Sequence, residues 1–346
     1  MKMNKKALFG FTKRYISYII IAAVALVYTA LTLTSGVKTA DLYLLEKIAI
    51  AIILAVSLGM VVGFLGELSL GHAGFMCVGA YLGGKVSVLL EPVLGNSLPT
   101  LLISLLAGGL VAALAGLIIG LPALRLRGDY LAIVTLAFGE IVKNIIINLK
   151  FTGGAIGYDT QDIYQSPKSF ALFPYAAVAV FVAVVLVMNL TKSKHGRAIT
   201  AVRDNKIAAS ATGVNATYFK LVVFSFAAFL AGVAGVLWGH SGSIIKASTF
   251  DFNMSIEILV IVVLGGMGSI RGSVIAAVVL KLLPEVLRNL NEDLVKYRML
   301  IYSVMLILIM LFNSAPAFVA FRERLNIKNL FKVKKSKKEK DEKEVA

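Results

Sequence analysis

The sequence is poor in charged residues, cysteine and histidine. Of its 346 residues only 16% are charged and 58% are hydrophobic, whereas soluble domains average about 25% charged and about 45–50% apolar residues. The single cysteine, Cys77, excludes an internal disulfide and a cysteine metal cluster. Three histidines scattered along the chain argue against a catalytic metal site. Because so large an apolar excess cannot be buried in one soluble core, the composition predicts one integral membrane domain.

The net charge of +16 is concentrated at the two ends of the sequence. Five basic residues and no acid precede the first apolar run, and ten Lys/Arg stand against five acids over residues 322–346. Basic segments beside apolar spans stay in the cytoplasm and can contact anionic membrane lipid. This placement argues against nucleic-acid binding. We expect a basic cytoplasmic N-terminus (1–15), a transmembrane domain (16–318) and a basic, disordered cytoplasmic tail (319–346).

Apolar runs recur along the chain, and a helix needs about 20 such residues to cross about 30 Å of hydrocarbon. The first run is longer than the apolar core of a signal peptide, so we expect an uncleaved first span. With both termini in the cytoplasm the number of crossings is even, and we expect ten, the third and eighth being short or re-entrant. The candidate segments are 16–33, 42–65, 68–90, 98–121, 130–149, 170–190, 218–238, 256–266, 273–290 and 299–312.

A basic loop, residues 191–215, follows the sixth candidate span and falls on the cytoplasmic side. Its segment 197–211 has helical character, with Ile199, Val202 and Ile207 near one stripe. The pattern predicts one short amphipathic helix that lies in the lipid interface or fills a groove in a partner protein. An ordinary solvated loop is the alternative.

The end of this loop and four further segments resemble the sequence of a known family. Residues 207–213, which read IAASATG, resemble the EAA-x-x-x-G coupling loop of bacterial ABC importer permeases, with Ile207 in place of Glu and Gly213 placed to end the helix. The sequence resembles the branched-chain amino acid permeases from about Leu42 to Phe312, and urea and amide permeases share much of the pattern. The segments are LSLGHAGFMCVGAY (68–81), LRLRGDYLAIVTLAFGEI (124–141), TGG (152–154) and LGGMGSIRG (264–272).

The resemblance implies an all-α permease of about ten transmembrane helices, some short or broken by glycine, with a cytoplasmic coupling helix in the 191–215 loop. Such a chain binds no cofactor and is not an enzyme. In a bacterial cytoplasmic membrane it pairs with a second permease subunit, similar or identical, and two ATPase subunits bind ATP and Mg²⁺. An extracytoplasmic binding protein delivers leucine, isoleucine or valine. We expect the ATPase contact to come from Arg203, Asp204, Asn205, Ala208, Ala209 and Gly213.

Polar residues and glycines inside the spans are the candidates for the substrate pathway. A charge in hydrocarbon costs at least about 2.5 kcal/mol, so such side chains face protein or water. Glu140 and Lys143, three residues apart, are either a polar lining for an amino-acid zwitterion or a mutually satisfied pair. His72 either contacts substrate or, as we favour, bonds to a neighbouring helix. The pathway candidates are Gly71, His72, Gly74, Thr135, Glu140, Gly265 and Gly266.

Two other transport functions remain open. The same ABC role for urea, short amides or nucleosides would change only a few cavity side chains. An ion-coupled secondary transporter would lack the coupling helix and need a mid-membrane carboxylate, for which Glu67 or Glu140 could serve. Residues 79–86 approach a P-loop, but Val86 replaces the Mg²⁺-binding Ser/Thr and the segment lies in a span. We therefore expect no ATP hydrolysis by this chain.

Overall fold

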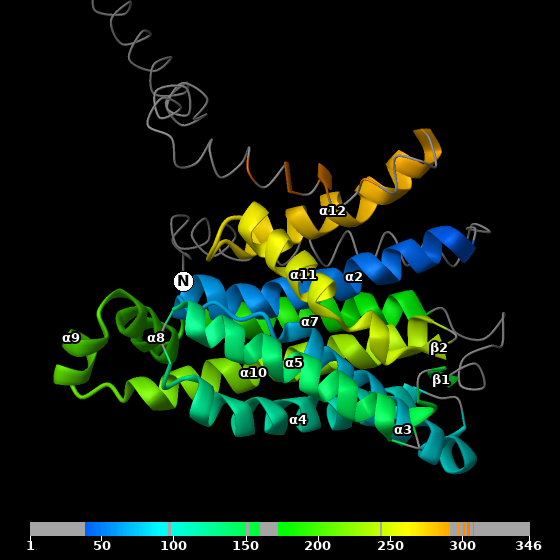
Figure 1. Cartoon of the computed structure of the whole chain (residues 1–346), viewed down its shortest axis with the longest axis horizontal. Helices are drawn as coiled ribbons and strands as arrows, with labels where there is room; N and C mark the ends of the chain where they lie inside the picture. Colours follow the sequence, from blue (N-terminus) through cyan, green and yellow to red (C-terminus); the bar gives the residue numbers. More distant parts are fainter. Residues whose placement is uncertain are drawn as a thin grey trace, which may run out of the picture. The chain divides into compact units, whose positions relative to one another are not determined.

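The structure, a computed structural model, describes residues 39–95, 98–126, 128–149, 152–154, 156–159, 172–242 and 244–290, with single residues between 297 and 307. The chain divides into two compact units, Met1–Val286 and Leu287–Ala346. All that follows concerns the first unit. Helices dominate its described residues, as the sequence predicts (Figure 1).

The regular elements among the described residues are helices, apart from one pair of two-residue strands. Strands β1 (Tyr158–Asp159) and β2 (Ile244–Ile245) are antiparallel, with Tyr158 opposite Ile245. The helical elements are α2 (Thr39–Gly59), the π-helical turn η1 (Met60–Leu65), α3 (His72–Leu94), α4 (Leu98–Ala123), α5 (Asp129–Asn148), α7 (Leu172–Lys192), α8 (Lys194–Asp204), α9 (Lys206–Ala211), α10 (Ala216–Ser241), the 3₁₀ turn η3 (Ala247–Thr249), α11 (Phe252–Leu264) and α12 (Ile270–Leu290).

Within the described residues, six helices are long and apolar enough to cross a membrane: α2 with η1, α3, α4, α5, α7 and α10. The third predicted span is a full-length helix of 23 residues, so the expectation that it is short is wrong. The eighth is short, as expected, because the 13 residues of α11 cover only about 20 Å. Predicted span 16–33 and most of 299–312 lie outside the described residues. The total of ten crossings stays a prediction.

Helix α10 is the centre of the bundle and contacts α2, α3 and α4. Small residues let it approach α3 closely, since a Cβ added to Gly79 would overlap the Gly232 backbone and one added to Gly235 would overlap the Met76 carbonyl oxygen. In lipid no hydrophobic effect drives helices together, so close van der Waals packing of this kind carries their association. The glycines of α3 and α10 therefore fix the helix spacing of the core.

The 191–215 loop and the β1–β2 pair lie at opposite ends of the bundle (Figure 1). Helix α7 runs directly into α8 and α9, and α10 starts just after α9. The far end of α10 leads into β2, which pairs with β1, and β1 follows α5 along the chain. The C-terminal end of α5 is therefore at the end remote from the loop.

We predict opposite effects for two glycine-to-alanine changes in α3. Gly79→Ala should lower the thermal stability of the detergent-solubilised protein by several degrees, because its methyl group has no room against Gly232. Gly84→Ala is the matched control. Its added Cβ would meet only the Ile245 Cδ1 atom, at 3.5 Å. Because alanine stabilises a helix by about 0.5–1 kcal/mol relative to glycine, this variant should have a slightly higher Tm. Equal losses of Tm in the two variants would contradict this account of the α3–α10 packing.

Candidate functional site: the 191–215 loop and its contacts with the bundle

The 191–215 loop contains two helices separated by a break at Asn205. Asn205 has extended backbone angles (φ −154°, ψ 101°) and ends α8. Its Oδ1 accepts hydrogen bonds from the backbone N–H groups of Ile207 and Ala208, both at 3.0 Å, and so caps α9. The prediction of one continuous helix over 197–211 is therefore wrong. The physical reason is that an asparagine side chain competes with the helix for backbone N–H groups.

The break changes which side chains share a face. Ile199 and Val202 are buried, as the predicted stripe requires, but Ile207 is 84% exposed. Because α9 restarts in a new direction after Asn205, Ile207 no longer continues the buried stripe of α8. An exposed isoleucine at the start of α9 is instead available to a partner.

Gly213 ends α9, as the sequence predicts. Its φ of +86° is a left-handed conformation that glycine adopts without strain. The N–H of Val214 donates to the Ala209 carbonyl oxygen and the N–H of Gly213 to that of Ser210, each at 3.1 Å. This pair of bonds is a Schellman motif, which satisfies carbonyl groups at the helix end.

The candidate contact residues of the loop fall into two groups. Ala209 is buried in a small core with Val202 and Ala216, against which Val214 packs. It therefore stabilises the loop and does not present itself to a partner. The exposed group consists of Asp204, Asn205, Ala208 and Gly213, together with Lys206 and Ile207.

Arg203 connects α8 to the end of α2. Its Nη1 donates to the Gly63 carbonyl oxygen at 2.9 Å, and its Nε and Nη2 donate to Asp204 Oδ1 at 2.9 and 2.8 Å. Gly63 lies in the last turn of α2–η1, where carbonyl groups lack intrahelical partners. The Arg203 side chain also remains 41% exposed, so its predicted contact with an ATPase stays a prediction.

Gly63 also contacts the turn between α11 and α12. A Cβ added to Gly63 would overlap the backbone nitrogen of Gly268, and one added to Gly66 would lie 2.6 Å from Arg203 Cγ. Next to this contact, Glu67 and Lys220 form an ion pair whose side chains are 12% and 8% exposed. These residues, named here the loop junction, are Gly63, Gly66, Glu67, Arg203, Lys220 and Gly268.

Gly265 and Gly266 build the turn on which the loop junction rests. Gly266 and Gly268 both have φ +86°, and a Cβ on Gly265 would overlap the backbone of Gly272 and Ser273. These glycines thus make a tight connection from α11 to α12. Their role in a substrate pathway stays a prediction.

The other glycine candidates pack the start of α3 against α5. A Cβ on Gly71 would lie 2.5 Å from the Thr135 carbonyl oxygen, and one on Gly74 would lie 2.7 Å from Gly139 Cα. Thr135 Oγ1 also accepts from the Leu70 N–H at 3.0 Å. The structure therefore brings Gly71, Gly74 and Thr135 together as a helix contact.

Two polar candidates have partners inside the bundle. His72 Nε2 lies 2.7 Å from Ser57 Oγ on α2, which is the helix-to-helix bond favoured from the sequence. Lys143 forms an ion pair with Glu140 one turn earlier on α5, as in the mutually satisfied alternative. Glu140 nevertheless remains 36% exposed.

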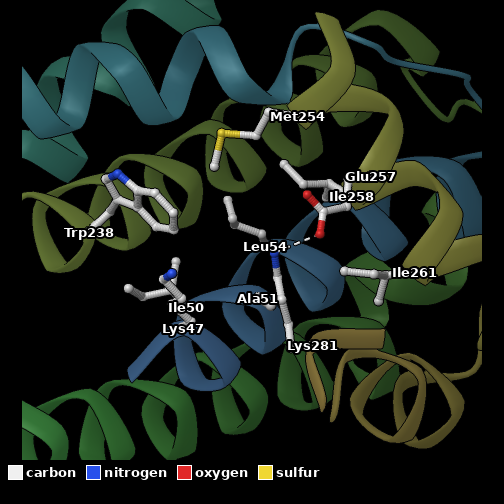
Figure 2. Close-up of a pocket in the computed structure, with 10 residues that line it drawn as sticks. All are labelled: Lys47, Ile50, Ala51, Leu54, Trp238, Met254, Glu257, Ile258, Ile261 and Lys281. Atoms are coloured by element: carbon white, nitrogen blue, oxygen red, sulfur yellow. Dashed lines mark hydrogen bonds and ion pairs between the residues drawn. The ribbon is translucent and has the colours of Figure 1, made fainter. Parts of the chain in front are cut away.

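A further charged pair lies between α11 and α12. Lys281 Nζ donates to Glu257 Oε1 at 2.8 Å, as Figure 2 shows. The cavity around it holds about 10 Å³, room for little more than one water molecule. Sequence reasoning missed Lys220 and Lys281 as partners, although a lysine inside an apolar segment signals a nearby carboxylate. Among the described residues, no three His, Cys, Asp or Glu side chains gather as a metal site requires.

The bundle and its apolar helices define a multi-span membrane protein, and comparison with known proteins identifies its family. The sequence profile described as branched-chain amino acid transport system / permease component matches residues 42–310. The chain therefore belongs to this family of permease components.

Its relatives are transport permeases rather than enzymes. The high-affinity branched-chain amino acid transport system permease proteins LivM of Salmonella typhimurium and Escherichia coli are each 35% identical over 309 residues, covering 81% of this chain and 70% of theirs. A probable branched-chain amino acid transport permease protein LivM of Methanocaldococcus jannaschii is 25% identical over 252 residues, 70% of this chain and 72% of its own. No solved structure matches the chain.

The buried Glu67–Lys220 pair predicts a strongly non-additive mutant cycle. Lys220→Met strands a buried carboxylate and should lower the free energy of unfolding by about 3 kcal/mol. Adding Glu67→Gln removes the stranded charge and should recover most of that loss. Thermal unfolding in detergent measures each variant. A double variant as unstable as the sum of the single variants would contradict the pairing.

Proposed function

We propose that this chain is the membrane-spanning permease subunit of an ABC importer in a bacterial cytoplasmic membrane. It carries leucine, isoleucine and valine into the cytoplasm, driven by ATP and Mg²⁺ bound in separate ATPase subunits. Family membership supports the transport role. The main support for the ATP-driven mechanism is the structure of the 191–215 loop. Its helix α9 is exposed, and its Arg203 is hydrogen-bonded to Gly63 at the end of α2–η1.

The exposed side of α9 suits a groove in an ATPase subunit. An apolar anchor flanked by polar side chains is how a short helix docks in a partner's groove, and Ile207, 84% exposed, is that anchor. Asp204, Asn205, Ala208 and Gly213 flank it. Two such loops, one from each of two paired permease subunits, would hold two ATPases.

The loop junction gives the ATPase a mechanical route into the bundle. A displacement of α8 would move the Arg203 guanidinium, and with it the Gly63 carbonyl at the end of α2. Because Gly63 and Gly268 are in backbone contact, the same displacement reaches the α11–α12 turn. Packed cores switch between discrete arrangements instead of deforming continuously, so such a push can change the side on which the bundle opens.

The orientation follows from the loop. If ATPases bind it, the loop is cytoplasmic, and the β1–β2 pair and the C-terminal end of α5 face outward. There an extracytoplasmic binding protein would deliver the amino acid. Both termini would then be cytoplasmic, in agreement with their basic residues.

An ion-coupled carrier is the weaker alternative. Such a carrier needs a carboxylate that is free to bind the coupling ion at mid-membrane. The two carboxylates that could bind the coupling ion, Glu67 and Glu140, both form ion pairs with lysines of the chain. A permease for urea, amides or nucleosides would share the loop and differ in its substrate.

Uptake of labelled leucine and labelled urea in cells that lack this chain and redundant carriers tests the proposal. We expect leucine uptake to depend on the chain, to stop with vanadate and to leave urea uptake unchanged. Unchanged leucine uptake would refute the substrate, and vanadate-resistant uptake would refute the ATP-driven mechanism.

We predict that Gly213→Pro leaves the protein inserted but abolishes ATP-driven uptake. Proline fixes φ near −65° and removes an N–H, so it cannot adopt the φ of +86° or donate to Ser210. Gly95→Pro is the matched control, since Gly95 also has positive φ and donates one backbone bond but lies outside the loop. Membrane insertion and leucine uptake are measured for both. Normal uptake by the Gly213 variant would mean that the end of α9 transmits no force.

A further inference from the structure

Helix α5 leaves one face uncovered by the described chain, and that face has two chemically different halves. Its first half is apolar after Asp129 and Tyr130 at the helix start, whereas its second half carries amides. Glu140, on the edge of this second half, is partly exposed. The exposed residues of the face are Asp129, Tyr130, Ile133, Val134, Ala137, Ile141, Asn144, Ile145 and Asn148.

The exposed face of α4 shows what a lipid-facing surface looks like in this protein. Between residues 102 and 121 every exposed side chain of α4 is leucine or isoleucine. The second half of α5 differs, because its exposed side chains include the polar Asn144 and Asn148. Each of these amides has one bond to the helix backbone, but its second N–H and its oxygen would lack partners in hydrocarbon. Unpaired amide groups cost roughly 2–7 kcal/mol there, depending on the transfer scale, so polar side chains within spans face protein or water. This half of α5 therefore does not border lipid.

The polar half of α5 is the outer half under the proposed orientation. Glu140 lies 11 residues after Asp129 in a helix of 20 residues, which puts it about 16 Å along a length of about 30 Å. Asn144 and Asn148 follow at successive turns toward the β1–β2 end. The polar stripe thus runs from mid-membrane to the outer surface.

A shallow groove, largely open on the side away from α5, follows this stripe. It has a volume of about 450 Å³ and is lined by Ile141, Asn144, Ile145, Asn148 and Leu149. Small-molecule sites commonly measure about 300–1,000 Å³. Three branched aliphatic side chains beside two amides match a ligand that is aliphatic at one end and polar at the other.

The two amides keep hydrogen-bonding capacity for a ligand. Asn144 Nδ2 donates to the Glu140 carbonyl oxygen at 2.9 Å, and Asn148 Nδ2 donates to that of Asn144 at 2.7 Å. These bonds fix each side chain against the helix. A primary amide has two N–H groups and one oxygen, so each side chain retains one donor and its acceptor.

We propose that this surface, named here the α5 groove, binds the branched aliphatic α-amino acid as it enters from outside. The oxygens of Asn144 and Asn148 accept from the ligand's ammonium group, and their remaining N–H groups donate to its carboxylate. The two isoleucines and Leu149 contact its side chain. The groove is one wall of the site, and the paired permease subunit supplies the opposite wall. The proposal rests on the proposed function for its substrate and orientation.

Cysteine labelling in the complete transporter tests this directly. Replacing the single, buried cysteine, Cys77→Ala, gives a background without thiols, into which Asn144→Cys and Asn148→Cys are introduced separately. Cells are exposed to a membrane-impermeant methanethiosulfonate, which reacts with hydrated thiolates and hardly at all with thiols in lipid. Leu110→Cys on the exposed face of α4 is the lipid-facing control, and Val134→Cys is the control for the apolar half of α5.

We expect positions 144 and 148 to label at least about tenfold faster than 110 and 134, and saturating leucine, but not urea, to slow that labelling. Labelling at 144 and 148 as slow as at 110 would overturn the proposal, because the face would then border lipid. Fast labelling that leucine does not slow, in cells whose parental transporter takes up leucine, would also overturn it. Absent leucine uptake by that parent would refute the proposed substrate instead, while the labelling rates still report whether the face is hydrated.

A kinetic measurement separates binding from folding. Asn144→Leu and Asn148→Leu keep the size of the side chain and should raise the KM for leucine uptake by about tenfold or more, since each removes bonds to a charged group. Leu110→Ala, on α4, should leave the KM unchanged. A normal KM in both asparagine variants would contradict the assignment.

Discussion

The hydrogen bond from Arg203 to the Gly63 carbonyl is the contact on which the proposed mechanism depends. It is the point where the 191–215 loop, whose α9 is largely exposed, is attached to a helix of the apolar bundle. The carbonyl is available because α2 ends there in a π-helical turn, and such turns recur at functional sites. Asp204 accepts two further bonds from the guanidinium within the loop, so the arginine is held in place while its one bond to Gly63 joins loop and bundle.

Close backbone contacts determine how far such a push can travel. A methyl group on Gly63 would overlap Gly268, and one on Gly79 would overlap Gly232. Elements in backbone contact move together, whereas elements separated by long side chains can slide. The glycine-rich segments that resemble the family are therefore best explained as packing surfaces of a moving bundle. The proposed α5 groove lies on a different surface, which the described residues leave uncovered.

The sequence predicts what depends on local composition and spacing. Apolar runs predicted the six described spans, and the left-handed glycine at 213 was predicted as the end of the loop helix. The break at Asn205 was missed, because periodicity counts apolar residues and does not register one side chain capping a new helix. The Arg203–Gly63 bond joins residues 140 positions apart and the Glu67–Lys220 pair residues 153 apart. A local pattern can show that a buried charge needs a partner, but it does not identify a partner so far away in the sequence.

The most direct test measures leucine transported per ATP hydrolysed by the complete transporter in liposomes, comparing Arg203→Ala with Arg197→Ala, an exposed arginine on the same helix. If the loop junction transmits force, Arg203→Ala lowers that ratio at least about tenfold with ATP hydrolysis and Tm nearly unchanged. Arg203→Lys restores part of the ratio, because lysine can still donate to the carbonyl, and Arg197→Ala has no effect. An unchanged ratio in Arg203→Ala would contradict the account.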